Sequence, residues 1–434
     1  MPRFIHLLLM LLPCQLVAQT NELLSYKGAI ELALNNNFDI QITKNAASIA
    51  SVENNIGSAG FLPRADLNSN GTIANSQTKQ EFSSGQTVNK NGVISKNFNA
   101  GLQLSYTLFD GFRMFATKER LALLEEQGEL NLKLQLENTI EAVTLNYYQI
   151  VKQEQSIKGI LAMMDVTHER LKLAETKLTI GSGSKVEVLQ AKLDLNAQKS
   201  NLLLQRSLLQ EAKNNLLQVM QAPQLKNFVV DSTFEFEPLA SMDVIRQKIE
   251  SNNRNVQLAK QMLLITDAEM KEIKSQSLPR LGLLSNHSFS RNQSTAGFAL
   301  FNQNLGNSVG FNFTWNIFNG FIQKRQLEVA RIQQHSNRLQ VDRILSSLYT
   351  ESANAYLRWL NDQQTLKLEE ENIQLAEQSL FIMLERMKLG LGNYLETKES
   401  QSSYEAAFTR LVNARFNLKE SETRLRKITG EFIQ

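Results

Sequence analysis

The sequence predicts a mainly α-helical protein that also carries membrane-type β-strands and repeats one structural unit twice. The stretch LQLSYTLFDGF at 102–112 returns as FNFTWNIFNGF at 311–321. Both stretches alternate apolar and polar residues, which is typical of a strand with two different faces. The segments that follow, 113–180 and 322–389, contain no proline and place apolar residues at spacings of 3 and 4, as coiled-coil helices do.

Length and composition limit the possible number of domains and the class of partner. The 434 residues could form about two or three ordinary domains or one elongated domain. The formal net charge of +3 is too small to suggest nucleic acid as a partner. Only 6 prolines occur, and this scarcity favours long uninterrupted helices.

The N-terminus has the pattern of an export signal, with Arg3 before a short apolar core and Pro13 after it. We predict that residues 1–19 are removed; an ordinary buried helix is the alternative. Cys14, the only cysteine, would carry lipid in a lipoprotein, although Pro13 suits that cleavage poorly. Cleavage downstream of Cys14 would leave the mature chain without a cysteine, so it could not form a disulfide. Since no later apolar run is long enough to span a bilayer, we expect an exported protein without a helical anchor.

The self-match extends over nearly the whole chain and indicates a tandem repeat. We predict a first repeat at 20–221, a connector at 222–241 and a second repeat at 242–434. Each repeat should contain a helix, the letters LPR, two strands around a polar loop, a long helix, a Gly-rich turn and a returning helix. Aligned pairs include Tyr147 with Tyr356, Lys177 with Arg386, Gly181 with Gly390, Gly183 with Gly392, and Glu187 with Glu396.

Four strands are expected in each chain, at about 64–76, 95–109, 280–292 and 305–318, with polar loops at 76–94 and 290–306. Strands of about 9 to 11 residues can cross a bilayer when tilted. An apolar face alternating with a polar one indicates a membrane barrel, while a soluble sheet with one buried face is the alternative. Because four strands cannot close a barrel, we expect an oligomer that shares one. The predicted lipid-facing residues are Leu102, Leu104, Tyr106, Leu108, Phe311, Phe313, Trp315 and Ile317.

In each copy, a similar turn should connect the second strand to the helix that follows. The turn contains Asp110-Gly111 in the first copy and Asn319-Gly320 in the second. Glycine suits a sharp backbone turn. The flanking aromatics fit a membrane–water interface, and packing at a helix start explains them equally well. These aromatics are Phe109, Phe112, Phe318 and Phe321.

Each long helix would extend roughly 100 Å and then turn back at a Gly-rich tip, at about 181–185 and 390–394. The apolar seam of the first long helix should be buried as a coiled-coil core. It comprises Ile140, Val143, Tyr147, Ile150, Ile157, Leu161, Met164, Leu171 and Leu178. The returning helix of the second copy repeats the spacing with Leu411, Ala414, Leu418, Leu425 and Ile428. Each half is therefore predicted to form a helical hairpin.

With these parts in place, the sequence resembles the TolC-like outer-membrane efflux factors over nearly all of the mature chain. The marks are LPR before a strand, the endings LFDGF and IFNGF, and paired Gly-rich tips followed by a carboxylate. The resemblance implies a homotrimer with a twelve-stranded barrel in the outer membrane of a Gram-negative bacterium, continued by a coiled-coil tunnel through the periplasm. It also implies a passive exit duct of a tripartite efflux or type I secretion system. Its partners would be outer-membrane lipid, a periplasmic membrane-fusion (adaptor) protein and an inner-membrane pump of the RND, ABC or MFS type.

The family's tip motif places Asp-Val-Leu-Asp shortly after a glycine, and this chain has Glu396 and Glu399 at the two acidic positions. The first copy has Glu187 and then Gln190. The resemblance implies a pore gate at Glu396, Glu399 and Glu187, where a ring of like charges would favour cations. The glutamate side chain at the two acidic positions is longer and less rigid than the aspartate of the family's motif. The alternative is that these are solvated carboxylates at a helix start. Glycines at the tips either contact the adaptor or only form the turn. They are Gly181, Gly183, Gly390 and Gly392.

No enzyme, cofactor or metal site is expected. The four histidines lack metal-ligand spacing, and no phosphate-binding loop or nucleophile motif occurs. Two rival classes make different predictions. A periplasmic adaptor would have one helical hairpin and no lipid-facing strands, and a secreted structural or adhesive protein would not need alternating strands with aromatic ends. The sequence does not name the transported substrate.

Overall fold

The structure is a computed structural model that describes residues 22–225, 227–297 and 299–433. The predicted export signal, with Cys14, lies outside these residues. The chain forms two compact units, and each takes segments from both halves of the sequence. Unit 1 comprises residues up to Gln41, Leu136–Gln247 and residues from Thr350 on. Unit 2 comprises Ile42–Gln135 and Lys248–Tyr349.

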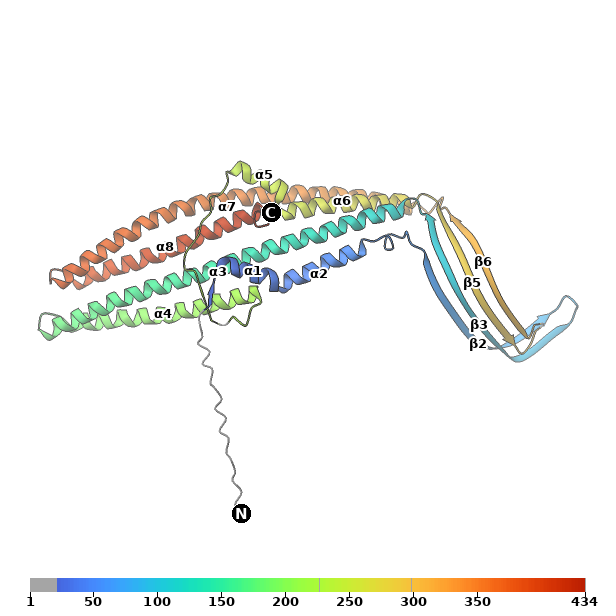
Figure 1. Cartoon of the computed structure of the whole chain (residues 1–434), viewed down its shortest axis with the longest axis horizontal. Coiled ribbons are helices and arrows are strands. Elements are labelled where there is room, and N and C mark those ends of the chain that lie inside the picture. Colours follow the sequence, from blue (N-terminus) through green and yellow to red (C-terminus); the bar gives the residue numbers. More distant parts are fainter. Residues whose placement is uncertain (1–21, 226, 298, 434) are drawn as a thin grey trace, which may run out of the picture. The chain divides into compact units, whose positions relative to one another are not determined.

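The helices and strands follow one order in the two halves, as the repeat predicts (Figure 1). The first half contains α1 (Tyr26–Asn36), α2 (Phe38–Glu53), β2 (Arg64–Glu81), β3 (Thr87–Phe109), α3 (Arg113–Thr179) and α4 (Lys185–Met220). The second contains α5 (Met242–Asn252), α6 (Arg254–Ser275), β5 (Arg280–Ser294), β6 (Phe301–Thr314), α7 (Ile322–Lys388) and α8 (Tyr394–Ile428). The two long helices are confirmed, since α3 and α7 are 67 residues each.

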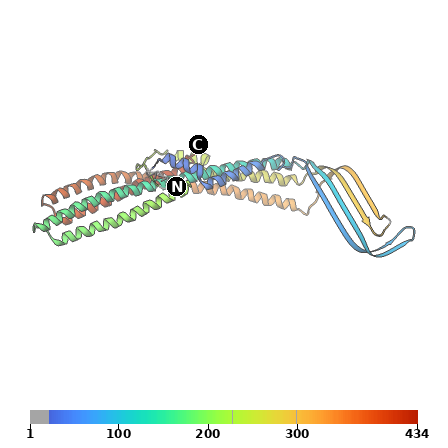
Figure 2. The same cartoon turned by 60° about the horizontal axis from the view of Figure 1, so that its bottom comes forward.

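Unit 2 contains one curved antiparallel sheet in the order β2-β3-β5-β6, whose four strands lie side by side in Figure 1 and in the turned view of Figure 2. The two halves of the chain meet between β3 and β5, where Leu102 pairs with His287. Within the described strands, β2 and β6 each have a partner on one side only. The sheet is therefore open at both edges in the single chain.

The strands differ in extent from the prediction. The expected loops at 76–94 and 290–306 were too long, because β2 and β3 continue to pair as far as Glu81 with Thr87. A backbone ladder satisfies its own hydrogen bonds whatever the side chains are, so polar composition alone misled the prediction. At its other end β6 stops at Thr314. Trp315 and Ile317 therefore lie beyond the strand.

Unit 1 has its main core where α1, α3 and α4 meet a small parallel sheet. This sheet pairs β1 (Glu22–Leu24) with β4 (Phe228–Val230). Phe228 and Val230 are buried beside Tyr147 and Leu216. The predicted connector at 222–241, whose run from Phe228 to Phe236 has a β-like pattern, therefore contributes a short strand and core residues to unit 1.

The predicted coiled-coil seam is buried only in part. Val143, Tyr147 and Ile150 of α3 are fully buried, whereas Leu161 and Leu178 are about two-fifths exposed, at 40% and 39%. The seam of α8 is buried throughout, from Leu411 to Ile428. The prediction was wrong for the two exposed leucines, because a 3-4 spacing identifies a face of a helix but not whether this chain covers it.

Candidate functional site: the helical tips and the two-faced sheet

The two helical tips in unit 1 have the same construction. At the first, the amide of Ser182 donates to Lys177 O at 2.9 Å, and Gly181 has φ +78°. At the second, Leu391 donates to Arg386 O at 2.9 Å, and Gly390 has φ +76°. These are Schellman-type helix ends, which favour glycine in the left-handed position. The tips therefore stop both long helices by one local mechanism.

A second glycine in each tip allows the backbone to pass close to the helix just ended. A Cβ on Gly183 would lie 2.7 Å from the Cβ of Lys177, and one on Gly392 would lie 2.8 Å from the amide nitrogen of Met387. The next helix then begins at an N-cap, Ser184 or Asn393, whose side chain accepts from a backbone amide. The turn alone explains all four glycines, so adaptor contact remains a prediction for them.

The predicted gate carboxylates lie at the starts of α4 and α8. Glu187 and Glu396 occupy the first turns of these helices, where the N-terminal dipole favours negative charge. Glu396 and Glu399 are exposed, and Glu187 is half-buried. None of the three is in an ion pair recorded for the described residues. Their charges are therefore open to solvent or to a ligand in the single chain.

A buried polar cluster near the tips joins both helical hairpins, and the sequence analysis missed it. Arg170 of α3, only 1% exposed, donates to Asp194 of α4 at 2.8 Å and to the Tyr394 hydroxyl of α8 at 2.7 Å. Its other terminal nitrogen donates to Gln401 of α8. Lys398 of α8 pairs with Asp194 at 2.9 Å. An arginine beside a seam position gives no signal by itself, so only the packing of three helices identifies this cluster.

The cluster holds Asp194 in its ionised form. Partial burial on its own would raise the pKa of this carboxyl, but hydrogen bonds from Lys398, Arg170 and Gln190 outweigh it, and the pKa lies below its usual value. The negative charge in turn balances the buried guanidinium of Arg170. The ends of the two hairpins are therefore held together by charge as well as by apolar packing.

One face of the sheet is polar and nearly free of charge. The strand pairing aligns its side chains in rungs of four, one residue from each strand. Charges appear at the strand starts, where Asp66 accepts from Arg64 at 2.9 Å. The three uncharged rungs beyond are Asn68–Gly101–Ser288–Gly306, Asn70–Asn99–Ser290–Asn304 and Thr72–Asn97–Asn292–Asn302. Amide and hydroxyl groups of this kind suit contact with water.

The opposite face carries those predicted lipid-facing residues that lie within the strands, and all eight predicted residues are exposed in the single chain. In β3 and β6, Tyr106 and Phe311 flank Leu283 across the pairing. The face also includes a polar pair, since His287 hydrogen-bonds Asn307 on the neighbouring strand. Trp315, beyond the strand end, donates its indole N–H to Ser277 O at 3.0 Å. Lipid contact remains a prediction for these side chains.

The strand-to-helix junctions also repeat in detail. Phe112 and Phe321 have φ +66° and +61°, a left-handed conformation that residues with a side chain rarely adopt. Their rings pack edge-to-face on Phe109 and Phe318, with centroids 5.2 and 5.3 Å apart. Packing therefore accounts for part of each aromatic pair. The exposed faces of Phe112 and Phe321 still fit the interface interpretation.

The comparisons with known proteins agree with this geometry. The family model described as outer membrane efflux protein matches residues 29–221 and 245–431. The outer membrane efflux protein BepC of Brucella suis biovar 1 (strain 1330) is 21% identical over 372 residues, 83% of this chain and 79% of BepC. The solved outer-membrane channel OprN has a TM-score of 0.75 at 17% identity, covering 93% of this chain and 89% of OprN. The Campylobacter jejuni CmeC outer membrane channel has a TM-score of 0.75 at 16% identity, covering 93% of this chain and 85% of CmeC.

The chain belongs to the outer membrane efflux protein family. It is an outer-membrane efflux channel of a Gram-negative bacterium and has the fold of TolC-like channels, so the predicted fold class, function class and location are confirmed. The family is one of channels, not of enzymes. None of the helices in the described ranges is long and apolar enough to cross a membrane. The same ranges contain no group of three His, Cys, Asp or Glu side chains placed to hold a metal ion.

Proposed function

We propose that three copies of this chain form a passive exit duct across the outer membrane. The observation that carries the proposal is the open sheet, whose edge strands β2 and β6 have one partner each. In lipid, such edges would leave backbone groups without hydrogen bonds, so neighbouring copies must cover them. Two copies would supply about eight strands, the smallest size of known membrane barrels. The resemblance to TolC-like channels favours three copies and twelve strands.

In this assembly the polar face of the sheet lines the lumen and the apolar face meets lipid. The uncharged rungs from Asn68 to Asn302 give solutes an amide- and hydroxyl-lined passage. Such a surface holds neither cations nor anions strongly, as a channel wall must not if solutes are to leave. The duct has no energy source of its own, so a pump has to drive transport and select the substrate.

The helical tips form the entrance and the contact with the rest of the system. Three copies each of Glu396 and Glu399, with Glu187 beside them, place like charges around one axis as a gate. The turns at Gly181–Gly183 and Gly390–Gly392 face a periplasmic membrane-fusion protein, which links the duct to an inner-membrane pump. Glu396 and Glu399 are exposed, and neither forms an ion pair with another of the described residues, which supports this role.

The test is to separate the membranes of a Gram-negative host by density and to measure the mass of the detergent-extracted protein. We expect an outer-membrane species of about three times the monomer mass that conducts ions in planar bilayers. A soluble periplasmic monomer would overturn the shared barrel.

A photo-crosslinker at Ser182 should capture the membrane-fusion protein, while one at the exposed Lys199 of α4 serves as the control. Equal capture at both positions would remove the tip as the contact site.

A further inference from the structure

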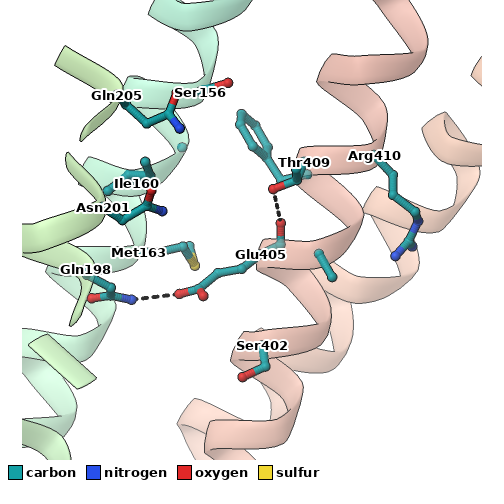
Figure 3. A pocket seen from close by; sticks show the side chains of 13 residues that line it. Ser156, Ile160, Met163, Gln198, Asn201, Gln205, Ser402, Glu405, Thr409 and Arg410 are labelled. Carbon is teal, nitrogen blue, oxygen red and sulfur yellow. Dashed lines mark hydrogen bonds between the residues drawn. The ribbon is translucent and has the colours of Figure 1, made fainter. Parts of the chain in front are cut away.

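Unit 1 contains a cavity among α3, α4 and α8 with a volume of about 610 Å³ (Figure 3). Side chains from both helical hairpins line it, among them Met163 of α3, Gln198 of α4 and Glu405 of α8. Sites for small organic molecules have volumes of about 300 to 1,000 Å³. The cavity is therefore large enough for such a molecule, and nothing in the family description assigns one to it.

Part of the wall is apolar. Ile160 and Met163 contribute from α3, and Phe408 contributes from α8. The ring of Phe408 reaches the backbone of α3 because residue 159 is glycine: a Cβ there would lie 2.2 Å from Cε1 of Phe408. Met163 is 7% exposed. A thioether and an aromatic ring in the wall of one cavity suit the body of an apolar or aromatic ligand.

The polar part of the wall is centred on the carboxylate of Glu405. In Figure 3 this side chain extends from α8 toward α4, where Gln198 Nε2 donates to it at 2.7 Å. Gln401 Nε2 donates to the same carboxylate oxygen at 3.0 Å. Both donors are neutral amides, and no ion pair of Glu405 is recorded in the described chain. The carboxylate is therefore half-buried without a counter-charge.

The positively charged residue among those that line the cavity does not supply that counter-charge. Arg410 also lines the cavity, but its Nε lies 3.0 Å from the carboxylate of Glu369 on α7. Figure 3 shows Arg410 on the side of α8 away from Glu405. The guanidinium is thus neutralised elsewhere, and the cavity keeps one negative charge.

A second acceptor, on the neighbouring Gln198, is not accessible from the cavity. The Oε1 atom of Gln198 is buried and no hydrogen bond reaches it in the described structure. Rotating this amide by half a turn would point Oε1 at the carboxylate of Glu405, so the observed orientation is the favourable one. A molecule in the cavity does not reach this buried oxygen, so the charged acceptor that the cavity presents is the carboxylate of Glu405.

We propose that this cavity binds a small organic cation, namely a protonated amine with an apolar or aromatic body. Its N–H groups donate to the carboxylate of Glu405, and its body lies against Ile160, Met163 and Phe408. A neutral or anionic analogue would leave the carboxylate without a counter-charge and would bind less well. Because α3 and α4 belong to one hairpin and α8 to the other, the ligand would bridge the two. The site is separate from the tip carboxylates and does not depend on their role as a gate.

The test uses the mature protein in lipid nanodiscs and the environment-sensitive fluorescence of dansylcadaverine, a primary ammonium on an aromatic body. Its N-acetyl derivative is the neutral probe. We expect saturable binding of the amine, about tenfold weaker binding of the acetylated probe, and a similar loss for the amine in Glu405→Gln. Glu211→Gln removes an exposed carboxylate of α4 that does not line the cavity, and it should bind like the wild type.

A second variant tests the cavity without changing the charge of Glu405. Ser402→Trp fills the cavity from an exposed position and should abolish binding of both probes while the thermal midpoint stays unchanged. If the amine shows no saturable binding, or binds equally well to the wild type, Glu405→Gln and Ser402→Trp, the cavity is not the proposed site. If the acetylated probe binds as tightly as the amine, the requirement for a cation is wrong.

Discussion

The guanidinium of Arg170 and the carboxylate of Asp194 meet at 2.8 Å between α3 and α4, at the point where both helical hairpins contribute to one polar cluster. Arg170 is almost completely buried, whereas the side chain of Asp194 is 18% exposed. Lys398 of α8 reaches the same carboxylate at 2.9 Å. Asp194 therefore pairs with positively charged side chains from both hairpins.

Removing this charge should destabilise unit 1. Asp194→Asn keeps the shape of the side chain but leaves Arg170 buried without its counter-ion, and we expect a loss of about 3 kcal/mol, the lower end for breaking a buried pair. The measurement is thermal unfolding followed by circular dichroism in detergent. Glu175→Gln is the matched control, because Glu175 pairs with Lys192 across the same two helices at 3.1 Å but both are about half exposed. That variant should lose less than about 1 kcal/mol. Equal losses would show that the buried pair contributes no more to the free energy of unfolding than the exposed pair does.

The contribution of Asp194 should disappear in acid. Its pKa in the folded protein lies below the unfolded value, because its hydrogen bonds to Lys398, Arg170 and Gln190 outweigh the opposing effect of burial. A carboxyl with a lowered pKa stabilises the fold at pH values above the unfolded pKa of about 3.9. This stability is lost as the pH falls through the folded pKa. The difference in thermal midpoint between wild type and Asp194→Asn should therefore be constant from pH 7 to pH 5 and shrink below about pH 4. A difference that does not shrink at any pH below the unfolded pKa would contradict this assignment.

Local patterns in the sequence predicted most of the fold. The two-residue period identified β3 and β6, the absence of proline identified α3 and α7, and the glycine pairs identified both tips. Each of these signals acts within a few residues of itself, because side-chain direction and backbone freedom are set locally. The duplication of every signal at a fixed shift then fixed the order of the elements.

What the sequence could not predict depends on contacts between distant elements. Arg170, Asp194 and Tyr394 meet only because three helices pack together, and none of them stands out in its own segment. The pairing of Leu23 with Val229 is equally non-local. The exposure of Leu161 illustrates the same point for apolar residues, since the spacing selects a helical face and the tertiary fold decides whether it is covered.

The second glycine of each tip should tolerate no side chain. Gly183→Ala would place a Cβ 2.7 Å from Lys177 Cβ and 2.9 Å from the backbone of Leu178, so the turn must open. We expect a cost of about 1 to 3 kcal/mol, as for other overpacked sites, and faster hydrogen exchange at residues 177–186. Gly310→Ala is the control, because a Cβ there meets nothing within 4 Å and its φ is ordinary. An unchanged exchange rate in Gly183→Ala would show that the tip is looser than its contacts indicate.

The selectivity of the open channel should be set at the tips and not in the sheet. The rung of Asn70, Asn99, Ser290 and Asn304 carries no charge. Glu396 and Glu399 are exposed and form no ion pair within the part of the chain that the structure describes. The double variant Glu396→Gln, Glu399→Gln should reduce the ratio of cation to anion permeability by about tenfold in low salt and less in high salt, because counter-ions screen the ring.

The complementary variant adds a charge where the sheet has none. Asn304→Asp places one carboxylate per chain on the neutral rung, and in the background of the double variant it should restore part of the preference for cations. Reversal potentials across planar bilayers under a salt gradient measure both effects. If the double variant leaves the ratio unchanged, Glu396 and Glu399 are ordinary solvated carboxylates at a helix start. If Asn304→Asp also has no effect, the polar face of the sheet does not line the passage.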